Sequence, residues 1–469
     1  MSPTTAILLD QIVDDSQRAL DQATSLLDQL MDSAAADHLL ATIDARLAAI
    51  DGLISSQLSA VMHAASFQQL ESSWTGLYYL VDRGEPDQNV QVRMLNVSKK
   101  ELIKDFQSAV EFDHSTVFRR VYEEEFGSFG GAPFGVLLGD YDITRQPGDL
   151  YLLEQMSHVA AAAHAPFVTA AGPGLFGLDS YADLAMPREL AKVFETADYA
   201  RWKAFRQSED ARYVGLTLPR FLGRLPFHPA NGKTTAGFHF VEDVAGIEAV
   251  NYLWCNAAYA FGARLSAAFA DFGWCAAIRG IDGGGLVDDL PVDSFHMGAI
   301  ARKCSLDVVI TDRREKELSD LGFIALVHCK NTSVAAFFGA QSAQRARKYD
   351  SDAANANAVL SAQLQYIFAV SRIAHYMKVM MRDKIGSFVS SGEVEDFLNR
   401  WVTRYVLLDD DASGEQKARF PLREASVHVS PVAGRPGVYR AVAFLRPHFQ
   451  LDELSVSLRL VAELPAASA

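Results

Sequence analysis

The segment Phe420–Pro465 constrains the fold of this chain more than any other stretch, because its pattern predicts three strands joined by turns. Ala425–Ser430 and Leu454–Leu460 alternate apolar and polar residues, which is typical of strands with one solvated face. Between them, Val438–Leu445 is apolar at nearly every position, which predicts a strand covered on both faces. Such a ribbon is either a small closed domain or an unfinished sheet that takes strands from neighbouring chains.

The composition is that of a globular protein whose partners are not nucleic acids. At 469 residues the chain is long enough for two or three domains, and 49% of its residues are hydrophobic. Its net charge of -15 argues against a general nucleic-acid binder, because such proteins use lysine and arginine to displace counterions from phosphate. The acidity permits a basic partner surface, or simply keeps the protein in solution.

The cysteines and the N-terminus indicate a reducing compartment. The four cysteines form no C-x-x-C pair and stand in apolar or strand-like stretches, so we expect buried thiols rather than disulfides or metal ligands. No basic region followed by an apolar stretch opens the chain, and the most apolar window, Val159–Leu178, is broken by His164 and by glycine and proline. We therefore predict a cytoplasmic protein with no membrane insertion.

The patterns divide the chain into three regions. Residues 1–65 carry two amphipathic helical patterns, the second from about Asp37 to Met62. Such terminal helices pack on each other or on the body of the protein, or they dock a partner. Residues 66–390 alternate strand-like and helical patterns, which predicts a mixed α/β (α+β) core. Residues 391–469 contain a further helix, Gly392–Leu408, and the terminal ribbon.

Within the core region the periodicity predicts individual elements. The predicted strands are Val90–Val97, Phe134–Tyr141, Pro166–Ala171, Tyr213–Leu218, Trp274–Arg279, Ser305–Thr311, Gly322–His328 and Val334–Phe338. The predicted helices are Lys99–Val110, Leu150–Ala163, Pro187–Phe194, Val250–Phe272 and Ala353–Arg382. The last of these is long and apolar on several sides, which predicts a buried central helix.

No constellation of residues points to catalysis, to a metal or to a cofactor. The chain contains no P-loop signature, no G-x-S-x-G and no H-E-x-x-H. His158 and His164 are six residues apart on a predicted helix, and His328 and Cys329 are adjacent in a predicted strand, so neither pair shares a face. We expect no catalytic residues, no metal and no cofactor.

Two alternatives to a structural role remain open. Gly283–Gly285 follows a predicted strand and could cradle an anion, which would make the chain an α/β enzyme or a nucleotide-binding protein. However, no predicted helix N-terminus follows this loop, and Asp282, Asp288 and Asp289 would repel phosphate. The other alternative is a soluble adaptor whose terminal helices bind partners.

Long stretches of the sequence resemble the large subunit of the type VI secretion contractile sheath, the TssC, VipB or ImpC family. The matching stretches cover most of residues 66–465. They include LNVSKKEL at Leu95–Leu102, VYEEEFGSFGG at Val121–Gly131, SEDARYVGLTLPRFLGRLP at Ser208–Pro226, GWCAAIRGIDGGGLV at Gly273–Val287, ITDRREKELSDLGFI at Ile310–Ile324, NRWVTRYVLLDDDAS at Asn399–Ser413 and YRAVAFLRPHFQLDELSVSLRLVAELP at Tyr439–Pro465.

The resemblance implies a structural subunit of a contractile machine and not an enzyme. Members of the family pair with a small sheath subunit, and the heterodimers stack as hexameric rings around an inner tube. The sheath assembles on a baseplate, contracts and propels the tube, and an AAA+ unfoldase then dismantles it. In this family the C-terminal strands join strands of neighbouring protomers in a shared sheet, so the resemblance favours the unfinished sheet.

The resemblance also implies three sets of interface residues. For strand exchange between subunits they are Val427, Val429, Val442, Phe444, Val456, Leu458 and Leu460. For contact with the inner tube they are Glu393, Glu395 and Asp396, although a solvated helix face explains these three equally well. For docking of the unfoldase they are Leu8, Leu9, Ile12 and Val13.

Overall fold

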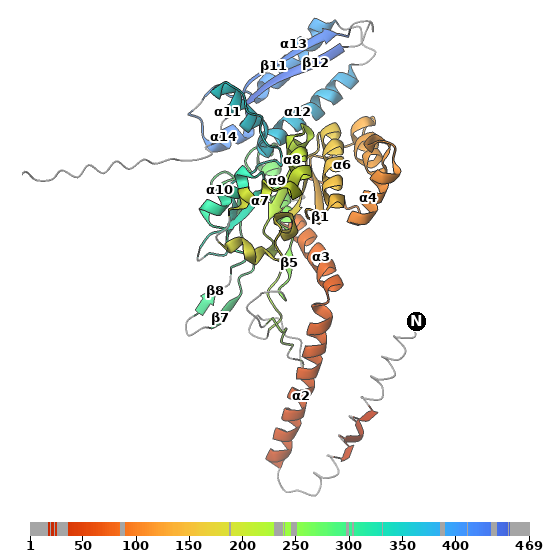
Figure 1. Ribbon diagram of the computed structural model, residues 1–469, viewed down its shortest axis with the longest axis vertical. Helices are drawn as coiled ribbons and strands as arrows, with labels where there is room; N and C mark the ends of the chain where they lie inside the picture. The colour runs from red at the N-terminus through yellow and green to blue at the C-terminus, as the bar shows by residue number, and fades with distance from the viewer. Residues whose placement is uncertain are drawn as a thin grey trace, which may run out of the picture. The chain divides into compact units, whose positions relative to one another are not determined.

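The structure is a computed structural model, and part of the chain is described in it. The described residues are 17–18, 20–22, 24–25, 36–84, 90–186, 189–228, 238, 240–244, 251–296, 300–302, 304–330, 332–384, 390–409, 411–432, 439–448 and 450. The chain forms two compact units, Met1–Gln68 with Pro226–Asn251, and Gln69–Leu225 with Tyr252–Ala469. Figure 1 shows the helices and strands of both.

The smaller unit is built on one long helix, α2 (Ala36–Met62). The helix predicted from Asp37 to Met62 is therefore confirmed. The segment before Asn251 packs on its C-terminal end, where the backbone N–H of Asp243 donates to the Ser59 hydroxyl at 3.1 Å. Next to this contact His63 Nε2 lies 3.2 Å from a Glu242 carboxylate oxygen.

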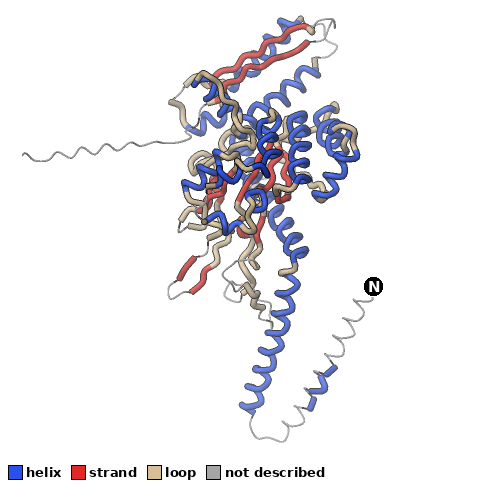
Figure 2. Tube along the Cα trace, in the orientation of Figure 1, coloured by secondary structure: helices blue, strands red, loops and turns tan. Residues whose placement is uncertain are grey.

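The larger unit is centred on a six-stranded mixed sheet, shown by the red strands of Figure 2. Its order is β1 (Leu137–Ile143), β2 (Phe167–Ala171), β3 (Val214–Leu218), β9 (Ile324–His328), β10 (Ala335–Phe337) and β6 (Leu286–Val287). The first four strands pair in parallel, and the last three pair antiparallel. Each of the first two parallel strands is followed by helices, as parallel connections require.

Helices cover both faces of this sheet, and the side chains of one strand alternate between the two layers. Helix α6 (Pro147–Ala163) packs on one face together with Phe167 of β2 and Ala325 of β9. Helices α9 (Ala257–Phe272) and α12 (Leu364–Asp383) pack on the other face with residues such as Ile324. This three-layer arrangement explains why β2 and β3 are buried along their whole length.

The remaining elements surround these layers and form three small sheets. The helices are α3 (Ala65–Arg83), α4 (Lys99–Ser108), η1 (Phe112–His114), α5 (Thr116–Phe118), η2 (Arg119–Gly127), η3 (Pro173–Phe176), η4 (Tyr181–Ala185), α7 (Leu190–Phe194), η5 (Ala197–Tyr199), α8 (Ala200–Gln207), η6 (Asp210–Tyr213), α10 (Asp312–Asp320), α11 (Asp352–Ser361), α13 (Ser391–Val402), η8 (Thr403–Tyr405) and α14 (Gly414–Arg419). The small sheets pair β4 (Phe221–Leu222) with β5 (Trp254–Cys255), β7 (Ser294–His296) with β8 (Ile300–Arg302), and β11 (Leu422–Pro431) with β12 (Tyr439–Pro447).

The predicted fold class, a mixed helix and strand core with N-terminal helices and a C-terminal ribbon, is confirmed. Three predicted strands are wrong. Val90–Val97 has no ladder partner in the described part of the chain, and Met94 is 63% exposed. Trp274–Arg279 forms turns after the glycine that ends α9. Ser305–Thr311 makes one isolated bridge, from Leu306 to β4.

The single helix predicted for Ala353–Arg382 is also wrong. It is divided into α11 and α12, because Gln363 bridges to Gln341 and the Leu364 N–H donates to the Ala340 carbonyl at 2.8 Å. The N-terminal half of α12 is buried, as predicted for a central helix, whereas α11 has no buried side chain among its described residues. A pairing with a distant segment thus overrides the local helical pattern.

Candidate assembly interface

The C-terminal ribbon packs on helix α13. The sequence of α13 favours a helix that begins at a defined residue and has one apolar face. Ser390 and Glu393 form a capping box that satisfies free N–H groups at the helix start. The same hydrogen bonds from Ser390 lower the pKa of the Glu393 carboxyl. Val394, Leu398 and Val402 follow at intervals of one turn and are buried. These three side chains form the apolar face on which the ribbon packs.

The register of the ribbon gives it one inner and one outer face. Val427 pairs with Ala443 and Val429 with Ala441, and both valines are buried in the cluster that contains α13. The residues between them point the other way, because successive side chains of a strand alternate. β11 and β12 lie beside α13 along their length in Figure 1.

Side chains of α13 cover the outer edge of β11. The Val427 N–H donates to Asn399 Oδ1 at 2.8 Å, and Asn399 Nδ2 donates back to the Val427 carbonyl at 2.7 Å. One turn earlier on the helix, a Glu395 carboxylate oxygen accepts from the Val429 N–H at 2.8 Å. An amide and a carboxylate thus occupy three of the backbone groups that a further strand would need on this side, the N–H and carbonyl of Val427 and the N–H of Val429.

The opposite edge, that of β12, offers backbone groups for pairing. Because Val427 directs its N–H and carbonyl to Asn399, its pair with Ala443 is of the non-hydrogen-bonded kind. Ala443 therefore points its own N–H and carbonyl away from β11, toward the free side of the ribbon. Within the described residues β12 pairs with β11 alone. The ribbon is therefore open to strand addition at one edge.

The outer face of the ribbon is apolar at its centre. Val442 and Phe444 are each 58% exposed, although the apolar run around them predicts a strand covered on both faces. That prediction is wrong for this chain, because α13 covers one face and the described residues leave Val442 and Phe444 open on the other. Large exposed apolar side chains on one face are typical of a surface that another molecule covers.

An aromatic cluster joins the ribbon and its helix to the core. Trp401 of α13 contacts Tyr376 of α12 and Tyr405, with ring centroids 5.9 and 5.3 Å apart. Trp274, which follows α9, lies 5.0 Å from Tyr405. Sequence reasoning missed this cluster and the edge contact of Asn399. The available signal was the spacing of Glu395 and Asn399, which places two polar residues on one side of an amphipathic helix.

The predicted interface residues divide between the described and the undescribed parts of the chain. Of the strand-exchange residues, Val427 and Val429 lie on the inner face, and Val442 and Phe444 on the outer face. Glu395 faces the ribbon, where its carboxylate also lies 3.0 Å from His428 Nδ1. Glu393 and Asp396 are exposed. Outside the described residues lie Val456, Leu458, Leu460, Leu8, Leu9, Ile12 and Val13.

The glycine loop considered for anion binding is a tight structural turn. The Gly285 N–H donates to the Gly280 carbonyl at 2.8 Å, and the Gly285 carbonyl accepts from the Phe337 N–H at 2.9 Å. A Cβ atom on Gly285 would lie 2.5 Å from the Phe337 carbonyl oxygen, and Gly284 has a φ of +86°. These glycines therefore allow the turn to pack against β10, which accounts for them without a phosphate.

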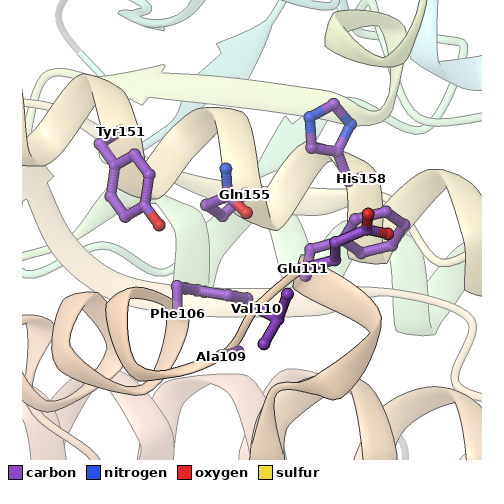
Figure 3. Close-up of a pocket in the computed structure, with 8 residues that line it drawn as sticks. Phe106, Ala109, Val110, Glu111, Tyr151, Gln155 and His158 are labelled. Carbon is purple, nitrogen blue, oxygen red and sulfur yellow. The ribbon is translucent and has the colours of Figure 1, made fainter.

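A surface cavity of about 280 Å³ lies between α6 and the segment after α4 (Figure 3). Tyr151, Gln155 and His158 line it from α6, and His158 Nδ1 lies 2.8 Å from an Asp210 carboxylate oxygen. The residues that line this cavity do not include a nucleophile hydrogen-bonded to a base that is itself held by a third group. Among the described residues there is no group of three metal-ligating side chains, and no helix with the length and apolar character needed to cross a bilayer.

Within the described residues, the ribbon pairs its two strands with each other and leaves the β12 edge unpaired. A family model described as "EvpB/VC_A0108, tail sheath N-terminal domain" matches residues 44–344. A second model, "EvpB/VC_A0108, tail sheath gpW/gp25-like domain", matches residues 353–464. The chain belongs to this family of contractile tail sheath proteins, and it is a structural protein and not an enzyme.

A curated relative gives the system in which such a sheath works. The chain is 45% identical over 457 residues to a protein of Pseudomonas aeruginosa named type VI secretion system sheath protein TssC1, and the match covers 96% of this chain and 90% of the relative. The resemblance to the type VI secretion sheath is thus confirmed. A solved structure of the baseplate of the anti-feeding prophage shares 10% identity with a TM-score of 0.39, covering 80% of this chain and 84% of that one. At so low a score nothing about function follows.

Proposed function

We propose that the chain is the large subunit of a type VI secretion sheath and that its ribbon is the joint between protomers. The observation that carries this proposal is the asymmetry of the ribbon edges. Asn399 and Glu395 occupy the β11 edge, whereas β12 presents the outward backbone groups of Ala443. A strand from a neighbour adds at this edge through backbone hydrogen bonds, and the alternating side-chain pockets set its register.

The strand that such a joint exchanges is the last one of the chain. Leu454–Leu460 alternates apolar and polar residues, so Val456, Leu458 and Leu460 would extend the apolar layer that α13 covers. A shared sheet keeps protomers linked while they rotate and slide. Each interface of this kind would differ only slightly in free energy between the two states of the sheath. Summed over many interfaces, these differences would drive one cooperative change of the whole sheath.

The partners of this subunit follow from the same assignment. We propose that it pairs with a small sheath subunit, that the pairs stack as hexameric rings around an inner tube on a baseplate, and that assembly and contraction take place in the cytoplasm. The relative is named as a sheath protein of the type VI system, which supports this assembly. In the proposed division of labour, residues 1–65 lie outermost, residues 66–390 form the wall, and residues 391–469 face inward.

Two further contacts belong to this proposal. Glu393 and Asp396 are exposed on α13 and are available to an inner tube, whereas Glu395 is engaged by the ribbon and would hold the helix in place. The unfoldase that recycles the contracted sheath would dock on Leu8 and its apolar neighbours Leu9, Ile12 and Val13.

Truncation tests the joint directly. Removal of residues 451–469 from the chain, co-expressed with its small subunit, should leave a folded heterodimer and abolish tubules, because the exchanged strand is lost while the capped ribbon remains. The matched control removes Ala466–Ala469 alone and should assemble normally. Electron microscopy gives the length of tubules, and circular dichroism confirms the fold. Intact tubules from the longer truncation would refute the strand-exchange joint.

A further inference from the structure

The segment Val90–Val97 has the residue pattern of a strand but no strand partner within the described chain. It precedes the start of α4 and contains neither a turn nor a bend. None of its backbone N–H groups donates a hydrogen bond to another described residue. Of its carbonyls, that of Val97 alone accepts one there, from the Tyr141 hydroxyl at 2.7 Å. An extended backbone with its hydrogen-bonding groups unused thus lies at the surface.

One side of this segment is fixed to the larger unit. The Arg93 guanidinium pairs with the Glu125 carboxylate and lies over the Phe134 ring, 5.6 Å from its centroid. Val97 follows Arg93 at an even spacing, so it lies on the same side of an extended chain, and it packs against the hydrophobic core around α6. These contacts hold the segment extended before any partner arrives, so pairing with it costs little ordering entropy.

The other side of the segment is apolar and open. Val92 and Met94 flank Arg93 and therefore point away from the body, where they are 41% and 63% exposed. The residues on this side carry no charge: Val90, Val92, Met94 and Asn96. Exposed apolar side chains along an unpaired strand are a liability that proteins normally cover, because such an edge recruits other strands.

A strand of a different subunit is the occupant that fits these features. Only a strand supplies a row of N–H and carbonyl groups at the spacing of an extended backbone, and its alternate apolar side chains would cover Val92 and Met94. The described strands already form their sheets without this segment. Two copies of the chain that paired through Val90–Val97 would form a closed two-fold dimer, whereas the proposed sheath repeats one contact in one direction.

We propose that Val90–Val97 pairs with a strand of the small sheath subunit, one that carries uncharged apolar side chains at alternate positions. This pairing rests on the proposed function, which supplies that subunit. It is a contact within the pair of subunits, whereas the ribbon is the joint between protomers. The segment that the sequence predicts as a strand thus becomes one in the heterodimer, where its backbone groups find their partners.

Hydrogen exchange of the full chain, purified together with its small subunit, tests the pairing. Amides of residues 90–97 that face the partner should exchange at least about tenfold more slowly than those of a synthetic peptide of the same sequence, because a paired strand must open before it exchanges. Rapid exchange along the whole segment, in a heterodimer that still builds tubules, would overturn the pairing and leave the proposed function standing. If neither heterodimer nor tubules form, both fail.

Two adjacent proline variants show whether the backbone makes the contact. Met94→Pro and Leu95→Pro each remove one N–H, and consecutive N–H groups of a strand point to opposite sides. Neither N–H has a partner in the described chain, so both variants should keep the Tm of the parent. One variant should bind the small subunit at least about tenfold more weakly, and the other should bind it as the parent does. Equal affinities of the two variants would overturn the pairing, and slow exchange in both would then assign the edge to a segment of the chain itself.

Discussion

At the scale of single residues, His375 of α12 is a buried base held neutral by its surroundings. It is 3% exposed, and its Nε2–H donates to the Ala163 carbonyl at 2.8 Å. Nδ1 has no hydrogen-bond partner among the described residues. Burial, with Arg372, His164 and Lys378 nearby, lowers the pKa of His375 to about 4. A proton on Nδ1 would be an unpaired donor in an apolar, positively charged site.

Because of this residue, the free energy of unfolding should decrease as the pH decreases. The unfolded chain binds the proton with the ordinary pKa of 6.5, and the folded chain binds it at about 4. The stabilising contribution is thus complete above pH 6.5 and is lost as the pH falls toward 4, on the order of 3 kcal/mol in all. His375→Gln keeps a donor for Ala163 and removes the titration. Its Tm should approach or pass that of the natural chain between pH 7 and pH 5, and parallel curves for the two proteins would contradict the assignment.

At the scale of elements, the fit of α13 to β11 depends on one amide. Asn399 is the side chain that satisfies both backbone groups of Val427, so Asn399→Ala should cost about 1–3 kcal/mol and leave a strand edge open. Thermal unfolding gives the cost, and light scattering reports the added association. Arg400→Ala changes the next residue, whose side chain is exposed, and should stay within about 0.5 kcal/mol of the natural chain. Equal losses of stability from the two substitutions would contradict the conclusion that Asn399 covers the edge of β11.

Elements defined by local periodicity could be predicted from the sequence. The alternation in Ala425–Ser430 predicts β11, and the helical pattern of Leu150–Ala163 predicts most of α6. Elements decided by distant contacts could not. The break before Leu364 depends on pairing with residues near Ala340. The segment Val90–Val97, exposed except at its two ends, finds no ladder among the described strands.

The same limit applies to the candidate site. The periodicity predicts where the ribbon lies in the chain. It does not predict which strand edge is covered, because the contact of Asn399 with β11 joins residues far apart in the chain. The exposure of Val442 and Phe444 likewise depends on which side α13 takes, and composition gives no sign of that.

At the scale of the whole molecule, the exposed centre of the ribbon should matter for assembly and not for folding. Phe444 is 58% exposed, so Phe444→Asp removes little burial within the chain and should change its Tm by only a few degrees. If another subunit covers this face, a charge there should abolish tubules with the small subunit. Phe444→Tyr keeps the ring and should still assemble. Normal tubules from Phe444→Asp, seen by electron microscopy, would show that this face stays uncovered.

The capped edge of β11 also limits how far a shared sheet can grow. A ribbon with two open edges could template strand after strand, as in a cross-β fibre, and thousands of copies packed in one polymer would make that a constant hazard. In the proposed joint, Asn399 and Glu395 hold backbone groups on one side, so strands would add on the other side alone and each sheet would close at a finite size. These two side chains would therefore limit each shared sheet and guard against cross-β growth.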